Sequence, residues 1–221
     1  MQFSEFKEII LGLFPDITPD QLAKYEAMEA LYDEWNSKIN VISRKDIGGL
    51  YPHHVLHSLA IADYLRVQRP ETYEKWVEGG LEVLDLGTGG GFPGIPLAVL
   101  FPRVNFTLCD SVGKKTIVAG GVSQALGLKN VTVVNARAES LGKTFDFVVS
   151  RAVTSLDNFY PWVKGRYRDS ILYLKGGDVA EETALMMARN RLAKGSVYTF
   201  PIDSWLPGID YTGKFVIDIR K

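Results

Sequence analysis

A glycine-rich segment that directly follows an apolar run constrains this chain more than any other feature. The segment "VLDLGTGGGFPG", residues 83–94, holds five of the 21 glycines. Gly87, Gly89 and Gly91 stand where a strand would end and a helix would begin. Because glycine has no Cβ, the backbone there can turn sharply and approach a ligand closely. The chain is therefore expected to build a ligand site at the end of its first strand.

Short apolar runs alternate with segments of helical length from Leu81 onward. Such alternation is typical of a mainly parallel α/β sheet with right-handed crossovers, in which ligands bind at the carboxyl ends of the strands. The last two runs are joined too closely for a crossover helix, which predicts an antiparallel hairpin at one edge. The expected strands are 81–86, 104–110, 130–136, 145–150, 171–176, 196–202 and 214–221, and the expected helices include 114–127, 156–168 and 178–195.

The chain before this sheet follows a helical period instead. Apolar residues recur at helical spacing over 3–13, and "TPDQ" at 18–21 has the capping-box pattern that begins a helix. A third helix is expected over about 52–65, and the period changes at the glycine pair that follows. We therefore expect a small helical N-terminal region, 1–78, followed by a Rossmann-like α/β domain, 79–221.

Composition excludes several classes of protein. The 25 Lys and Arg against 26 Asp and Glu give a net charge of −1, so any binding to nucleic acid must use a local basic patch. Cys109 is the only cysteine, which excludes an internal disulfide and favours a reducing compartment. No apolar run approaches the roughly 18–20 residues that span a bilayer, and the first residues lack a secretory pattern. We expect a cytoplasmic monomer that does not bind membranes.

All three histidines lie close together, at His53, His54 and His57. His53 and His57 are four residues apart, a spacing that can present two metal ligands on one face of a helix. No further histidine or second cysteine completes such a site. We therefore expect no metal, and assign these side chains to helix packing or to hydrogen bonds with RNA.

Two classes of cofactor fit the glycine segment. A dinucleotide motif counted from Gly87 needs glycine where this chain has Phe92, and one counted from Gly89 starts three residues after the strand. Asp85 would repel a pyrophosphate but suits the cationic sulfonium of S-adenosylmethionine. Asp110 ends the second strand, where a carboxylate accepts hydrogen bonds from the ribose of either cofactor. The alternative for both acids is that they only cap loop amides.

Seven segments together resemble one protein family. In chain order they are "NVISRKD", "HHVLHSL", "LDLGTGGGFPGIPLA", "LCDSVGKK", "NARAES", "FDFVVSRAV" and "YLKGG", within roughly residues 36–178. This set closely resembles the RsmG (GidB) family of 16S ribosomal RNA guanine-N7 methyltransferases. The resemblance implies a class I S-adenosylmethionine-dependent methyltransferase fold. The chain departs from the family at His57, where aspartate is common, and at Gly120 and Gly121 inside an expected helix.

The resemblance also implies which residues contact S-adenosylmethionine, namely Gly87, Phe92, Ala138, Glu139 and Arg151. Ala138 and Glu139 follow the third strand, where adenine would lie, and the alternative for Glu139 is an exposed loop acid. With the acids and glycines considered above, the expected cofactor contacts are Asp85, Gly87, Gly89, Gly91, Phe92, Asp110, Ala138, Glu139 and Arg151.

The chemistry of guanine N7 explains which catalytic groups the sequence lacks. N7 has a free lone pair and loses no proton on methylation, so catalysis can rest on positioning and electrostatics without a general base. The segment after the fourth strand is "SRAV", not the Asn/Asp-Pro-Pro-aromatic motif of many amine methyltransferases. Cys109 is expected in the core and not as a nucleophile. Arg151 is the expected positioning residue.

Basic residues offer local contacts for the expected partner, 16S rRNA, either naked or in a small-subunit particle. "KGRYRD" at 164–169 interleaves a tyrosine with cations, as stacking on unpaired bases would favour. The alternative for each basic residue is solvated surface charge. The candidates are Arg44, Lys45, Lys114, Lys115, Arg166 and Arg168. Two other functions stay open at this point, an NAD(P)-dependent oxidoreductase and a non-catalytic RNA-binding or assembly factor.

Overall fold

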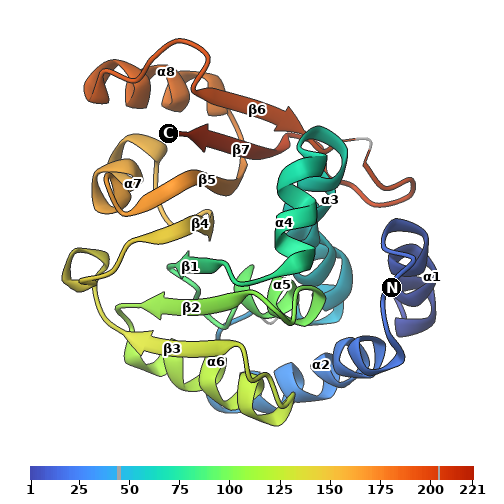
Figure 1. Cartoon of the computed structure of the whole chain (residues 1–221). Coiled ribbons are helices and arrows are strands. Elements are labelled where there is room, and N and C mark those ends of the chain that lie inside the picture. Colours follow the sequence, from blue (N-terminus) through green and yellow to red (C-terminus); the bar gives the residue numbers. More distant parts are fainter. Residues whose placement is uncertain (44–45, 204) are drawn as a thin grey trace.

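A seven-stranded sheet runs through the middle of the molecule (Figure 1). The computed structural model describes residues 1–43, 46–203 and 205–221. Neighbouring strands follow the order β3-β2-β1-β4-β5-β7-β6. The first five strands pair in parallel and β7 pairs antiparallel with β5 and β6, which confirms the predicted sheet. The strands are β1 Glu82–Leu86, β2 Asn105–Asp110, β3 Val131–Asn135, β4 Phe145–Arg151, β5 Tyr167–Gly176, β6 Val197–Pro201 and β7 Lys214–Arg220.

Helices cover the sheet unevenly. Figure 1 shows α7 and α8 on one face, while α2 to α6 lie on the other, and a separate hydrophobic cluster fills each layer. None of the helices in the described parts of the chain is long and apolar enough to cross a membrane. The α-helices are α1 Phe3–Leu13, α2 Pro19–Lys38, α3 His57–Gln68, α4 Pro70–Glu78, α5 Gly94–Leu100, α6 Gly113–Ala125, α7 Leu156–Val163 and α8 Val179–Asn190, with short turns η1 Ile47–Gly49, η2 Leu50–Leu56 and η3 Ala138–Ser140.

Helix α2 begins where its capping box predicts, whereas the helix expected over about 52–65 consists of the π-helical turn η2 followed by α3. The backbone N–H of Gln21 donates to Thr18 Oγ1 at 3.3 Å, and the N–H of Thr18 donates to Gln21 Oε1 at 2.8 Å. The buried Gln21 amide also donates to the carbonyls of Val99 and Leu100 at the end of α5. Residues of both regions share one hydrophobic cluster. The division at 78/79 stays a prediction.

Two predicted helices are too long at their carboxyl ends. The helix expected over 156–168 ends at Val163, because Gly165 turns the chain with φ +77° and Tyr167 already pairs with Phe145 as the first residue of β5. The helix expected over 178–195 ends at Asn190, where the next residue, Arg191, adopts a left-handed conformation. In the helix expected over 156–168, the pairing of Tyr167 with β4 therefore outweighs the helical pattern of the sequence.

Candidate active site

A cavity of about 530 Å³ opens at the carboxyl ends of the parallel strands, where the sequence predicts the ligand crevice. Residues at the ends of β1, β2 and β4 and just after β3 line it, and Lys115 of α6 and Trp162 of α7 complete the wall. Five of the nine predicted cofactor residues line the cavity, namely Gly87, Asp110, Ala138, Glu139 and Arg151. Ala138 is buried and Glu139 is exposed.

Gly87 is the glycine of the loop that the cavity requires most directly. Its φ is +73°, and a Cβ built there would lie 2.3 Å from Cγ2 of Val153, which also lines the cavity. A side chain at this position would strain the turn and displace the opposite wall. Gly89 has a similar φ of +57° but nothing lies within 4 Å of its would-be Cβ. Conformation alone therefore explains Gly89, whereas conformation and space both explain Gly87.

Asp110 combines loop capping with exposure to the cavity. Its Oδ2 accepts the backbone N–H of Gly89 at 3.0 Å, and its Oδ1 accepts that of Val112 at 2.8 Å. Because each carboxylate oxygen has more than one lone pair, these bonds leave acceptor capacity for the hydroxyls of a ribose. Both readings of Asp110 from the sequence are thus compatible with its geometry.

Asp85 lies beneath the glycine loop and does not line the cavity. The side chain is fully buried, and its Oδ2 accepts the hydroxyl of Thr88 at 2.6 Å and the N–H of Gly94 at 2.8 Å. Burial raises the pKa of Asp85 to about 7, against these hydrogen bonds and the charge of Arg151, which lower it. The geometry favours the loop-capping alternative, and direct contact between Asp85 and a cofactor stays a prediction.

The other predicted loop contacts also lie behind the cavity wall. Gly91 faces Ile95, whose Cδ1 would lie 2.3 Å from a Cβ at Gly91. Phe92 is 4% exposed, and its ring stacks on Tyr32 of α2 with centroids 4.8 Å apart. These residues support the loop from behind and do not line the cavity, so their contact with a cofactor stays a prediction.

Arg151 connects the cavity to this aromatic support. Its guanidinium carbon lies 5.1 Å from the centroid of Phe92, and the two Nη atoms reach the carbonyl of His53 and the ring of His54. Burial lowers the pKa of Arg151 to about 10, which keeps the side chain charged at neutral pH. A half-buried cation therefore stands at the end of β4, within the cavity wall.

The turn after Arg151 is fixed by Tyr173, the first residue of "YLKGG", for which the sequence predicted no individual role. Ala152 has φ +46°, and the backbone N–H groups of Val153 and Thr154 donate to the hydroxyl of Tyr173 at 2.9 and 3.2 Å. That hydroxyl donates in turn to the carbonyl of Thr154. The turn that faces the glycine loop is thereby held from β5. The contact of Tyr173 with this turn does not follow from the sequence, because it depends on the pairing of β4 and β5.

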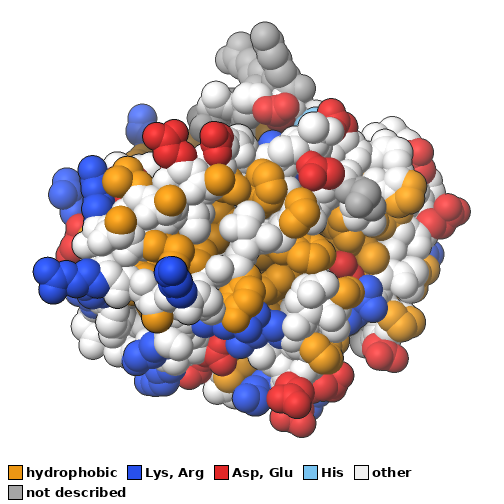
Figure 2. All heavy atoms as spheres, turned by 90° about the horizontal axis from the view of Figure 1, so that it is seen from above, with side chains coloured by type: hydrophobic (Ala, Val, Ile, Leu, Met, Phe, Trp, Pro, Cys, Tyr) orange, Lys and Arg blue, Asp and Glu red, His pale blue; other side chains and the backbone are white. Residues whose placement is uncertain are grey.

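The predicted RNA contacts are scattered over several surfaces. Lys115 lines the cavity and Lys114 is exposed beside it. Arg166 donates to the carbonyls of Glu139 and Leu141 and so holds the loop that carries Glu139. Arg168 pairs with Asp146 at 2.9 Å. Arg44 and Lys45 lie outside the described residues. On the face that Figure 2 shows, basic and acidic side chains surround a band of hydrophobic ones. The RNA contacts stay predictions.

The three histidines separate in the structure. His53 is exposed, whereas His57 is buried and its ring stacks on Tyr211 with centroids 5.8 Å apart. Burial, with the charges of Arg151 and Lys214, lowers the pKa of His57 to about 3. Within the described parts of the chain, no three residues of the His, Cys, Asp and Glu types gather as a metal site.

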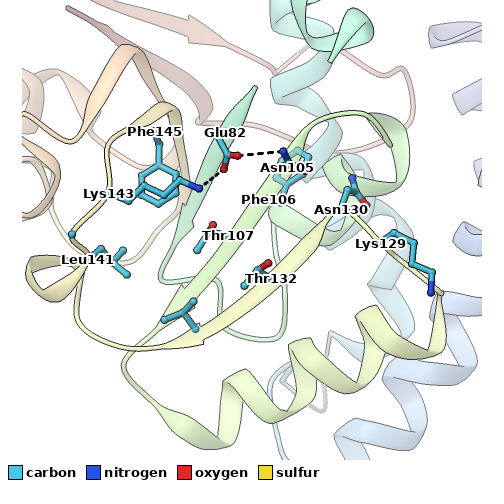
Figure 3. A pocket seen from close by; sticks show the side chains of 12 residues that line it. Glu82, Asn105, Phe106, Thr107, Lys129, Asn130, Thr132, Leu141, Lys143 and Phe145 are labelled. Carbon is cyan, nitrogen blue, oxygen red and sulfur yellow. Dashed lines mark hydrogen bonds and ion pairs between the residues drawn. The ribbon is translucent and has the colours of Figure 1, made fainter. Parts of the chain in front are cut away.

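A second hollow, of about 380 Å³, lies near the amino-terminal ends of β1 and β2 (Figure 3). In its wall, the carboxylate of Glu82 accepts from Lys143 Nζ at 2.5 Å and from Asn105 Nδ2 at 3.2 Å. Thr107 and Thr132, which pair on the neighbouring strands β2 and β3, also line it (Figure 3). None of the predicted cofactor residues lines this hollow, so the cavity at the carboxyl ends is the candidate active site.

Comparison with known proteins shows which family the chain resembles. Residues 21–203 match the family model described as rRNA small subunit methyltransferase G. The protein called ribosomal RNA small subunit methyltransferase G from Flavobacterium psychrophilum is 52% identical over 183 residues, which cover 79% of this chain and 83% of that protein. Its counterpart from Bacteroides thetaiotaomicron is 52% identical over 184 residues, or 80% and 84% of the two chains.

Solved structures of low identity show the fold. Magnesium protoporphyrin IX methyltransferase from Synechocystis PCC 6803, solved with bound S-adenosylmethionine, has a TM-score of 0.62 at 12% identity and covers 93% of this chain and 99% of its own. A 16S rRNA N2 methyltransferase (RsmC) from T. Thermophilus has a TM-score of 0.54 at 17% identity, over 75% and 43% of the chains. These structures confirm the predicted class I methyltransferase fold.

Proposed function

This chain belongs to the rRNA small subunit methyltransferase G family, and we propose that it transfers the methyl group of S-adenosylmethionine to N7 of a guanine in 16S rRNA. The cavity at the carboxyl ends of the strands carries this proposal, because it brings Gly87, Asp110 and Arg151 together in one wall. The comparisons favour this function over a dinucleotide-dependent oxidoreductase and over a non-catalytic assembly factor.

The residues of the cavity fit S-adenosylmethionine. A volume of about 530 Å³ is in the usual range for small-molecule sites. Asp110 provides acceptors for the ribose, Ala138 and Val112 provide apolar surface for the adenine, and the bare backbone at Gly87 allows close approach of the methionine part. When bound, the cofactor supplies an electrophilic methyl group on a positively charged sulfur.

The chain's own contribution to catalysis is orientation. Guanine N7 attacks through an existing lone pair, so no side chain has to remove a proton. The planar guanidinium of Arg151 is a good donor to the O6 edge of guanine, beside N7. Because Arg151 is held by Phe92 and the His53–His54 segment, its donors are fixed before substrate binds. Preorganised donors of this kind lower the cost of positioning the acceptor base.

Methyl transfer from labelled S-adenosylmethionine to small-subunit RNA tests the proposal. The expected product is 7-methylguanosine, identified by mass spectrometry of digested nucleosides. Naked 16S rRNA and intact small-subunit particles, assayed side by side, determine which form is the substrate. Methylation at another atom would refute the N7 assignment. Calorimetric binding of NADH without binding of S-adenosylmethionine would favour the oxidoreductase, and cofactor binding without transfer would favour the assembly factor.

The enzyme is further proposed to work as a monomer in the cytoplasm. The single, buried Cys109 supports a reducing compartment, and ribosomal RNA as substrate supports the same location. Light scattering after size-exclusion chromatography should give the mass of one chain. A stable dimer at micromolar concentration would refute the monomer.

A further inference from the structure

The guanidinium of Arg151 is oriented by a segment almost a hundred residues earlier in the chain. Its Nη1 donates to the backbone carbonyl of His53 at 3.2 Å, and its Nη2 lies 3.0 Å from Nδ1 of His54. Both acceptors belong to the π-helical turn η2, which leads into α3. Turns of this type are frequent at functional sites because they redirect side chains and carbonyl groups away from a regular helix. Arg151 is therefore attached to the N-terminal region at two points.

The contact with His54 fixes the chemical form of its ring. An arginine side chain carries only donors, so Nδ1 of His54 must be the acceptor and the ring proton must be on Nε2. Burial, with the nearby charge of Arg151, lowers the pKa of His54 to about 3. The neutral ring that accepts from Arg151 is thus the form present at physiological pH.

His54 and Arg151 also share one aromatic support. The His54 ring lies 5.2 Å from the ring of Phe92, and the Arg151 guanidinium lies over the same ring at 5.1 Å. Tyr32 stacks on Phe92 and donates its hydroxyl to the carbonyl of Gly90 in the glycine loop. An arginine held by a ring and by two acceptors has little freedom to rotate, so each acceptor contributes to the direction in which its remaining N–H groups point.

We propose that His54 is a positioning residue, which holds Arg151 through its Nδ1 in the orientation needed for methyl transfer. This inference rests on the proposed function. His54 does not line the cavity, so it acts through Arg151 and not on the substrate itself. From the sequence, the histidines were expected only in helix packing or RNA contact, and the structure gives His54 a specific partner.

Two substitutions separate hydrogen bonding from packing. In His54→Asn, the side-chain Oδ1 stands as many bonds from Cα as Nδ1 does, so the acceptor is kept while volume is lost. In His54→Leu, most of the volume is kept while the acceptor is lost. We expect His54→Leu to slow single-turnover methyl transfer by about tenfold, as misplacement of a positioned group does. His54→Asn should stay within about threefold of the parent, with thermal melting as the folding control.

The outcomes are distinct. If the rate follows volume, so that the leucine variant is active and the asparagine variant is not, or if both variants match the parent, His54 does not position Arg151. A double-mutant cycle adds a second check, because His54→Leu should cause no further loss in an Arg151→Ala background.

A measurement without turnover keeps the test independent of the proposed function. Nitrogen NMR of ¹⁵N-histidine-labelled protein should show His54 with its proton on Nε2 at pH 7. A proton on Nδ1 would overturn the contact. If the parent enzyme transfers no methyl group at all, the proposed function fails while this spectrum still decides whether His54 accepts from Arg151.

Discussion

Alanine at Gly87 and alanine at Gly89 test how the glycine loop shapes the cofactor cavity. Both residues have positive φ, +73° and +57°, so alanine should cost each variant about 1–2 kcal/mol of backbone strain. They differ in space. A Cβ at Gly87 would lie 2.3 Å from Cγ2 of Val153, whereas a Cβ at Gly89 would have no neighbouring atom within 4 Å. Gly89→Ala is therefore the matched control that isolates the contact with Val153.

The size of the difference follows from that contact. To reach ordinary van der Waals distance, Val153 must move by more than about 1 Å, and overpacking of this kind costs about 1–3 kcal/mol. For a chain of this length, 1 kcal/mol corresponds to roughly 2–4 °C in Tm. Gly87→Ala should therefore melt at least about 2 °C below Gly89→Ala. Because Val153 lines the cavity, Gly87→Ala should also lose at least about tenfold in affinity for S-adenosylmethionine, and Gly89→Ala less.

Calorimetry and thermal melting of four proteins decide the matter: the parent, the two single variants and the double variant Gly87→Ala/Val153→Ala. In the double variant the nearest remaining atom is Cβ of Val153, at 3.3 Å, so part of the stability and affinity should return. Equal losses in the two single variants, or no recovery in the double variant, would refute the reasoning that Val153 makes Gly87 necessary.

Three further predictions concern other parts of the fold. Gly120→Ala should raise the free energy of unfolding by about 1 kcal/mol, because its would-be Cβ meets nothing, whereas Gly121→Ala should lower it, because its Cβ would lie 2.1 Å from the ring of Trp35. Urea denaturation measures both. Asp85 has a raised pKa of about 7, so the folded state holds its proton more tightly and the parent loses stability as pH rises from about 4 to 7. The Tm of Asp85→Asn should not show this fall between pH 4 and 7. If Tm depends on pH in the same way in the variant and the parent, Asp85 does not have the raised pKa. Arg151→Lys keeps the charge but not the planar fork, and its single-turnover rate should fall by at least about tenfold with the fold intact; a parent-like rate would exclude the role.

The position of the site was predictable because topology converts strand ends into neighbours. Gly87, Asp110, Glu139 and Arg151 are far apart in the sequence, yet each follows an apolar run that becomes a parallel strand. Parallel strands joined by right-handed crossovers end at the same edge, so residues at those ends must meet. Asp85 shows the limit of this argument. A strand-end position determines the edge of the sheet, but it does not determine whether the side chain turns into the cavity or under the loop.

Side-chain contacts between distant elements were not predictable in this way. His54 lies 97 residues before Arg151, and Tyr173 lies 20 residues after Val153. Neither contact follows a helical or strand period, because each depends on how a whole element packs on another. The aromatic and polar residues involved also suit an ordinary core, so composition gives no additional signal.

Gly121, an unusual residue inside a helix, is explained by a contact with a distant residue, Trp35. Two glycines inside a helix cost about 1 kcal/mol each relative to alanine, and the sequence alone does not separate Gly120 from Gly121. The structure separates them, because the ring of Trp35 from α2 occupies the space beside Gly121 only. The close crossing of α2 on α6 then accounts for one glycine and leaves the other unexplained.

The same helix α2 carries Tyr32, whose ring supports Phe92 behind the glycine loop, while η2 supplies the acceptors for Arg151. The helical region before Gly79 thus contacts α6, the glycine loop and the end of β4, in addition to α5. An α/β domain without that region would expose the hydrophobic cluster that the two regions share. It would lose the acceptor at His54 and the aromatic stack under Phe92, and with them the fixed direction of the Arg151 guanidinium. The two parts are therefore distinct as sequence patterns but interdependent as an active site.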